Sequence, residues 1–242
     1  MKVMKSEDIQ KHITSTYISL RFGLVVIAIA FPLVLWIGGL LRDSPGLRGS
    51  MSAYYQSSMR DWFVGALFAI GACLYLYKGF TPKENRLLNL AAVFAVGVAI
   101  FPMDWPPKNW PPPGWPNEPI CKTFTAGNMH GTCAVLAFLC IALVCWFCAS
   151  DTLSLLKGQK RIKKYRRIYF WLGIAMLVSP LVAVVLNFTL GQSSYLFFAE
   201  LTAMYVFAAY WLVKSREIAA TNAEQKALMN ELTMNPAAQT ES

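Results

Sequence analysis

Charged side chains, histidines and catalytic signature motifs are scarce or absent in this chain. Asp, Glu, Lys and Arg make up 14% of its 242 residues, whereas hydrophobic residues make up 56%. No segment shows the alternating apolar and polar pattern of a membrane β-barrel strand, which excludes that architecture. Because only helices and closed barrels satisfy the backbone inside lipid, the composition predicts an all-α membrane protein.

Six long apolar runs contain most of the hydrophobic residues. Each run comes close to the roughly 20 residues that a helix needs to cross a hydrocarbon core of about 30 Å. A soluble core would not require six runs of this length. The sequence therefore predicts a polytopic membrane protein, with six transmembrane helices in one bundle. The predicted spans are 22–41, 62–78, 87–103, 131–149, 169–188 and 195–213.

The basic residues are distributed unevenly between the two sides of this predicted bundle. Only five of the 22 Lys and Arg residues fall on the side of the first loop: Arg42, Arg48, Arg60, Lys108 and Lys122. Cytoplasmic loops carry the excess of Lys and Arg, so both termini are predicted to be cytoplasmic. The predicted parts are a tail at 1–16, a transmembrane domain at 17–213, and a helical to disordered tail at 214–242.

The net charge of +9 indicates which partners the protein contacts in this topology. The densest basic cluster, Lys157–Arg167, favours contact with anionic lipid headgroups as well as a cytoplasmic location. No base-reading element accompanies the charge, so nucleic acid is not a predicted partner. We expect a multi-pass protein of the cell membrane, of the bacterial inner-membrane type.

The absence of catalytic signature motifs reduces the number of reactions that the sequence supports. The chain has no Gly-x-Ser-x-Gly elbow and no His-Glu-x-x-His pair. It has two histidines, and His12 falls on the predicted cytoplasmic side, which excludes a histidine-rich zinc site. Of the six cysteines, Cys140, Cys145 and Cys148 are interpreted as packing residues. A disulfide between Cys121 and Cys133 is chemically allowed, but their spacing does not establish it.

Polar residues at membrane depth fall near the predicted outer ends of the helices, whereas the inner ends carry mainly Lys and Arg. Burial of ionisable groups in a membrane is expensive, so their convergence predicts a polar pocket in the outer leaflet. The candidate pocket residues are Ser52, Tyr55, Arg60, Asp61, Asp104, His130, Asn187 and Glu200. Independent structural roles remain an alternative, because Asp61 suits a helix N-terminus and Asp104 suits an exposed helix end.

Glu200 is the hardest of these residues to explain as solvated, because it lies about 8 Å into its helix by the helical rise. We expect its side chain to face the bundle interior and to meet Arg60, Ser52 or Tyr55. We also expect Asp104 and His130 to be neighbours, because both flank the loop that joins the third and fourth spans.

The pocket is compatible with several functions. The leading prediction is the binding of a lipid or small amphiphile. A hydrolase acting on lipid headgroups is the alternative, with a serine nucleophile and His130 as general base. The cofactor is unknown, although a divalent metal could be held by Asp61, Asp104, His130 and Glu200. A proton-coupled transporter is less favoured, because the inner halves of the spans lack ionisable residues.

Three short motifs carry a family resemblance. They are Gly97-Val-Ala-Ile-Phe-Pro-Met-Asp104, Met129-His130-Gly131, and the stretch from Ser52-Ala-Tyr-Tyr55 to Arg60-Asp61-x-Phe-Val-Gly65. Together they resemble the uncharacterised bacterial, DUF998-like branch of the Frag1/DRAM/Sfk1-like membrane proteins, over about residues 17–213. The resemblance implies a six-helix bundle and a shared Asp104–His130 feature, and it implies no reaction. The chain also shows a weaker similarity to ceramidase-related membrane hydrolases, but it lacks their paired histidines.

Overall fold

The computed structural model describes residues 6–42, 47–103, 129–148, 151–156, 158–190, 194–221 and 223. Every element in these ranges is helical, so the predicted all-α class and the six long helices are confirmed. The α-helices are α1 (Ser6–Arg42), α2 (Arg60–Leu76), α3 (Pro82–Ile100), α4 (Met129–Leu143), α5 (Gln159–Leu190) and α6 (Ser194–Thr221). Three short elements join them: the 3-10 helices η1 (Ser52–Gln56) and η3 (Leu153–Leu155), and the π-helical turn η2 (Val144–Cys148).

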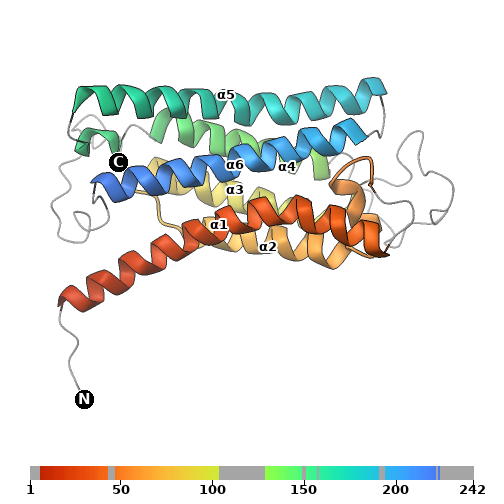
Figure 1. Cartoon of the computed structure of the whole chain (residues 1–242), viewed down its shortest axis with the longest axis horizontal. Helices are drawn as coiled ribbons and strands as arrows, with labels where there is room; N and C mark the ends of the chain where they lie inside the picture. The colour runs from red at the N-terminus through yellow and green to blue at the C-terminus, as the bar shows by residue number, and fades with distance from the viewer. Residues whose placement is uncertain are drawn as a thin grey trace, which may run out of the picture.

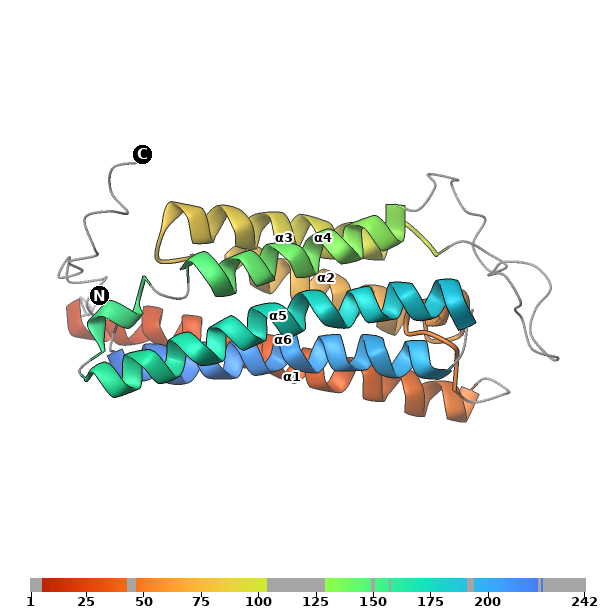
Figure 2. The same cartoon turned by 90° about the horizontal axis from the view of Figure 1, so that it is seen from above.

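The six helices form a ring in chain order. Each helix packs against the next one, and α6 returns to pack against α1. Figure 2 shows the ring as two layers, with α2, α3 and α4 in one layer and α1, α6 and α5 in the other. Consecutive helices run in opposite directions, so the ring has two distinct ends (Figure 1). We call them the η1 end and the η3 end, after the short helix that lies at each.

Among the residues that the structure describes, three helices are long and apolar enough to cross a membrane: Asp8–Arg42, Met129–Cys148 with η2 included, and Tyr195–Thr221. Large apolar side chains also face outward from α5, where Phe170, Trp171 and Val185 are all more than half exposed. An apolar exterior of this kind suits contact with lipid rather than water. The chain is therefore a multi-pass membrane protein.

Close helix contacts depend on two glycines of the α2–α3–α4 layer. A side-chain carbon on Gly71 would lie 2.7 Å from Val96 of α3, and one on Gly97 would lie 2.7 Å from the Cys133 sulfur of α4. Such small residues let helices approach closely in lipid.

The start of α3 carries two helix-start signals in the sequence. Pro82 occupies the first turn, and the Thr81 hydroxyl accepts the Glu84 N–H.

The helices extend beyond the spans predicted from sequence at two points. Helix α1 begins at Ser6 and crosses residue 17 without a break, and its first turns project beyond the other helices (Figure 1). Helix α6 continues past residue 213 to Thr221, which carries Lys214 and Glu217 into the ring. Asp104, Cys121 and the three tryptophans that follow Asp104 lie outside the described residues, so the predictions that involve them stay predictions.

Candidate functional site

The connection between α1 and α2 is folded into the η1 end of the ring. Tyr54, Tyr55 and Gln56 of η1 are buried, and so is the Arg48 side chain that precedes them. Buried backbone groups need partners. The Arg48 guanidinium supplies two donors, one to the Gln56 carbonyl at 3.1 Å and one to the Ala53 carbonyl at 3.4 Å. Most residues of the described part of the first loop, 47–59, are thus buried in the bundle rather than on its surface.

Glu200 of α6 binds the start of η1. Its Oε2 accepts the backbone N–H of Met51, and the carboxylate also interacts with the N–H of Ser52. The first N–H groups of a helical turn have no partner within the turn, and Met51 makes no side-chain cap for η1. Glu200 therefore caps η1 from another helix, and its side chain faces the bundle interior.

His130 of α4 contacts the side chain of Ser52, the first residue of η1. Its Nε2 lies 2.8 Å from the Ser52 Oγ, and its Nδ1 lies 2.8 Å from the carbonyl oxygen of Phe101. A carbonyl can only accept a hydrogen bond, so Nδ1 carries a hydrogen; in the neutral imidazole, Nε2 then accepts from the Ser52 hydroxyl. The ring stacks on Phe63 of α2, with 6.3 Å between centroids. This geometry is that of a serine hydroxyl paired with a base.

The remaining predicted pocket residues divide into three groups. Arg60 donates to the Tyr55 hydroxyl at 3.4 Å and lies 5.0 Å from the centre of that ring. Asp61 is exposed in the first turn of α2. Asn187 belongs to α5, but its side chain is not among those described, and Asp104 lies outside the described residues. The structure therefore brings Ser52, Tyr55, Arg60, His130 and Glu200 to the first loop, where they hold it in place.

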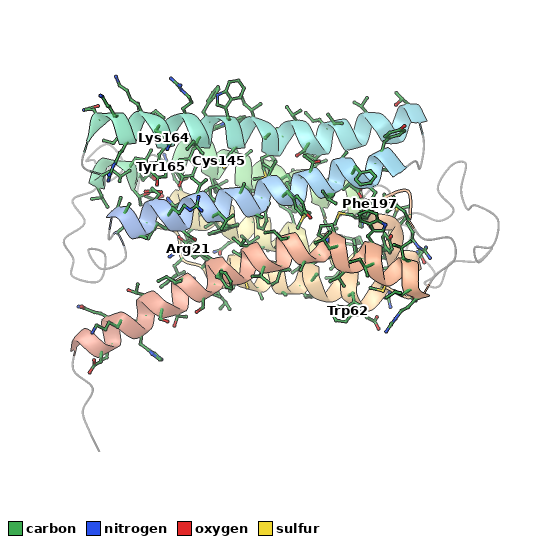
Figure 3. The ribbon with its side chains drawn as sticks, in the orientation of Figure 1. Arg21, Trp62, Cys145, Lys164, Tyr165 and Phe197 are labelled. Carbon is green, nitrogen blue, oxygen red and sulfur yellow. The ribbon has the colours of Figure 1, made fainter. Side chains whose placement is uncertain are left out.

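A separate apolar groove lies beside this loop, between α1 and α2. Its volume is about 510 Å³, and it is lined by Ala30, Leu33, Val34, Ile37, Gly38, Leu41, Arg42, Met59 and Trp62. Among the described residues that line the groove, Arg42 at the end of α1 is the only charged one. Trp62 projects outward from α2 in Figure 3 and is 57% exposed.

None of the six predicted pocket residues whose side chains the structure describes lines the groove. Met59 links the two features, because it ends the first loop, is buried, and donates its backbone N–H to the Ser57 Oγ at 3.0 Å. Sequence reasoning missed the groove since its residues are ordinary for a membrane helix. One available signal was the spacing of Ala30, Val34 and Gly38, which puts small side chains four residues apart on one face of α1.

The η3 end contains a second polar cluster, formed by fully buried ions. Glu84 of α3, and Lys214 and Glu217 of α6, are all 0% exposed. The Lys214 ammonium lies 3.2 Å from the Glu217 carboxylate and donates to the Thr152 hydroxyl at 2.9 Å. Tyr169 of α5 donates to the same Glu217 carboxylate at 2.9 Å. We call Glu84, Lys214, Glu217 and Tyr169 the η3-end cluster.

None of the residues of this cluster was among the predicted site residues. Lys214 and Glu217 follow the last apolar residue of the sixth predicted span, so they resemble a solvated flank. Because α6 continues as a helix, they turn into the ring. Arg21 of α1 joins the same end, where its Nε donates to the Ser215 hydroxyl at 3.2 Å. Figure 3 shows Arg21 between α1 and α6.

Two cysteines and a half-buried aspartate lie near the cluster. Cys145 and Cys148 in η2 are almost fully buried, as expected for packing residues, and their Cys-x-x-Cys spacing was not used in the sequence analysis. Burial raises the pKa of Asp151, which precedes Thr152. Within the described ranges, no three Cys, His, Asp or Glu side chains are grouped so that they could hold a metal ion.

Comparison with known proteins identifies the family. Residues 25–215 match the family described as "Protein of unknown function (DUF998)", so the chain belongs to it. No curated protein and no solved structure matches the chain.

Proposed function

We propose that this protein binds a lipid or another single-chain amphiphile in the groove between α1 and α2. The groove carries the proposal, because its volume of about 510 Å³ falls within the range of about 300–1,000 Å³ that is typical of ligand pockets. An acyl chain suits a lining that is apolar along its length. Arg42 stands at one end of the lining, where its guanidinium would bind an anionic headgroup.

The proposal includes a topology. Six spans with cytoplasmic termini put the η1 end and the groove mouth in the outer leaflet, and the basic start of α5 in the cytoplasm. There, Lys160, Arg161, Lys163, Lys164, Arg166 and Arg167 are exposed toward anionic headgroups. A cysteine at position 160 should then react with an impermeant reagent only from the cytoplasmic side. The relation to the Frag1/DRAM/Sfk1 superfamily and a location in the bacterial inner membrane belong to the same proposal.

In this proposal the polar residues of the η1 end position the groove. Glu200 and His130 fix the start of η1, and the loop then places Met59 beneath Gly38 as part of the lining. Trp62 at the rim suits the boundary between headgroups and acyl chains, where an indole ring is favourable.

A groove-filling pair of variants tests the binding function. Ala30→Trp fills the groove, whereas Ala72→Trp adds the same side chain at an exposed position of α2 outside it. The purified variants are incubated with a fatty acid that carries a photoreactive group, and the labelled peptides are identified by mass spectrometry. We expect label on α1 and α2 peptides in wild type and Ala72→Trp, and its loss in Ala30→Trp. Equal labelling of both variants would remove the groove as the binding site.

Ester hydrolysis is the second candidate function, and the Ser52–His130 geometry supports it. A fluorophosphonate probe forms a covalent bond with an activated serine. Under this candidate it labels Ser52 in wild type but not in His130→Gln, whose side chain lacks the imidazole base. An unlabelled wild-type Ser52 would leave His130 as an anchor for the first loop.

A further inference from the structure

The η3-end cluster has a charge imbalance that its contacts do not remove. Lys214 contributes one positive charge, whereas Glu84 and Glu217 contribute two negative charges when both are ionised, and all three are 0% exposed. An uncompensated ion in a low-dielectric interior is costly, and such groups change protonation state before they persist as charges.

Hydrogen bonds at the cluster are also incomplete. The Glu84 Oε2 accepts the Phe80 N–H at 2.8 Å, and the Glu217 Oε2 serves both Lys214 and Tyr169. The second oxygen of each carboxyl group is buried and has no hydrogen-bond partner among the described groups. The hydroxyl of Tyr210, which is fully buried on α6, is in the same condition. Unsatisfied buried polar atoms of this kind cost free energy unless a further group or proton satisfies them.

We infer that the η3-end cluster is a proton-binding site, in which one of the two buried carboxyl groups, Glu84 or Glu217, binds an exchangeable proton in the electrostatic field of the Lys214 ammonium. The proton neutralises the excess charge of the three buried ions. It also turns one unsatisfied carboxyl oxygen into a donor. The inference does not depend on the proposed amphiphile binding at the η1 end.

Every element around the cluster contributes to its electrostatic environment. Burial raises the pKa of Glu84, and the Lys214 charge opposes this effect. The facing titratable or charged groups are Arg21 (α1), Tyr77 (end of α2), Lys83 (α3), Cys145 and Cys148 (η2), Asp151 (before η3), Tyr169 (α5) and Tyr210 (α6). Arg21 contacts Ser215 and the Tyr77 ring, whereas Lys214 forms an ion pair with Glu217.

Infrared difference spectroscopy during a pH titration detects this proton directly, because a protonated carboxyl group has its own carbonyl band. The purified full-length protein is compared with Glu84→Gln, Glu217→Gln, Glu200→Gln and Asp8→Asn. Gln keeps an oxygen for the Phe80 N–H at position 84 but cannot titrate. Glu200→Gln accounts for the other interior glutamate, and Asp8→Asn removes an exposed carboxyl group of α1.

We expect wild type, Glu200→Gln and Asp8→Asn to share a protonated-carboxyl band that disappears as the pH rises, and that Glu84→Gln or Glu217→Gln abolishes. A band that survives in both of the last two variants would overturn the inference, as would its absence from wild type over the whole titration. If neither Gln variant folds, Tyr169→Phe provides the test. It removes one donor to Glu217, so the band should persist to higher pH, and an unchanged titration would count against the site.

Discussion

The two ends of the helix ring solve the problem of buried polar groups in different ways. At the η1 end, Glu200 and His130 are matched to partners on the first loop: two backbone N–H groups, one hydroxyl and one carbonyl. At the η3 end, Lys214 pairs with Glu217, Glu84 is buried at the same end, and each carboxyl group keeps one unsatisfied oxygen. A matched set fixes a loop in one position, whereas an unmatched set of ions responds to protonation. The difference assigns a structural anchor to one end and a titratable site to the other.

The largest expected effect comes from a substitution that removes the Lys214 ammonium from the η3-end cluster. Lys214→Met keeps the aliphatic volume but leaves two buried carboxylates without their ammonium. Breaking a buried ion pair in this way costs about 3–5 kcal/mol. We expect a strongly lowered unfolding temperature in detergent, with partial recovery at acidic pH because the carboxylates then become protonated. Lys160→Met, at an exposed position of α5, is the matched control and should unfold close to wild type.

Truncation of Glu200 breaks the η1 end. Glu200→Ala leaves the N–H of Met51 without its acceptor, which costs about 1–3 kcal/mol for a buried donor. Glu200→Gln keeps an acceptor oxygen and should retain most of the stability. Hydrogen exchange of residues 47–59 measures this effect locally. If Gln and Ala destabilise the loop equally, the negative charge matters more than the hydrogen bond and the anchor interpretation needs revision.

Sequence reasoning predicted both the helices and the η1-end residues from the pattern of apolar runs. Glu200 interrupts an apolar run and His130 directly precedes one, and isolated polar residues of this kind are visible without a structure. The η3-end cluster was missed because Lys214 and Glu217 follow the last apolar residue of their run, where solvated flanks are also found. Glu84 was missed for a similar reason, because acidic residues are common in the first turn of any helix.

The groove could not be deduced from residue types, because a lipid-facing residue and a groove residue are both apolar. What distinguishes Ala30 and Gly38 is the position of Met59 and Trp62 across from them. That position depends on how the first loop folds back into the ring. Contacts between segments distant in sequence therefore decide where the groove lies.

A pH series tests the η3 end without any loss of packing. The raised pKa of Glu84 means that the folded protein holds this proton more tightly than the unfolded chain does. Its contribution to stability is present below the ordinary carboxyl pKa and is lost as the pH rises through the raised value. We expect the unfolding temperature of wild type to fall relative to that of Glu84→Gln over this range. Parallel curves for the two proteins would show that Glu84 does not titrate in the fold.

The smallest expected effect compares two arginines at the η1 end. Arg60 stacks over Tyr55 and is partly exposed, so Arg60→Gln should cost no more than about 1 kcal/mol, the usual size of such a cation–π contact. It should leave amphiphile binding unchanged, because Arg60 does not line the groove. Arg42→Gln should leave stability unchanged, since Arg42 is exposed, but should lower the labelling of α1 and α2 peptides by an anionic photoreactive fatty acid. Labelling by a neutral alcohol of the same chain length should then be the same in both variants and wild type. If Arg60→Gln reduces labelling by the anionic probe and Arg42→Gln does not, the headgroup lies over the first loop and the groove holds only the tail or nothing.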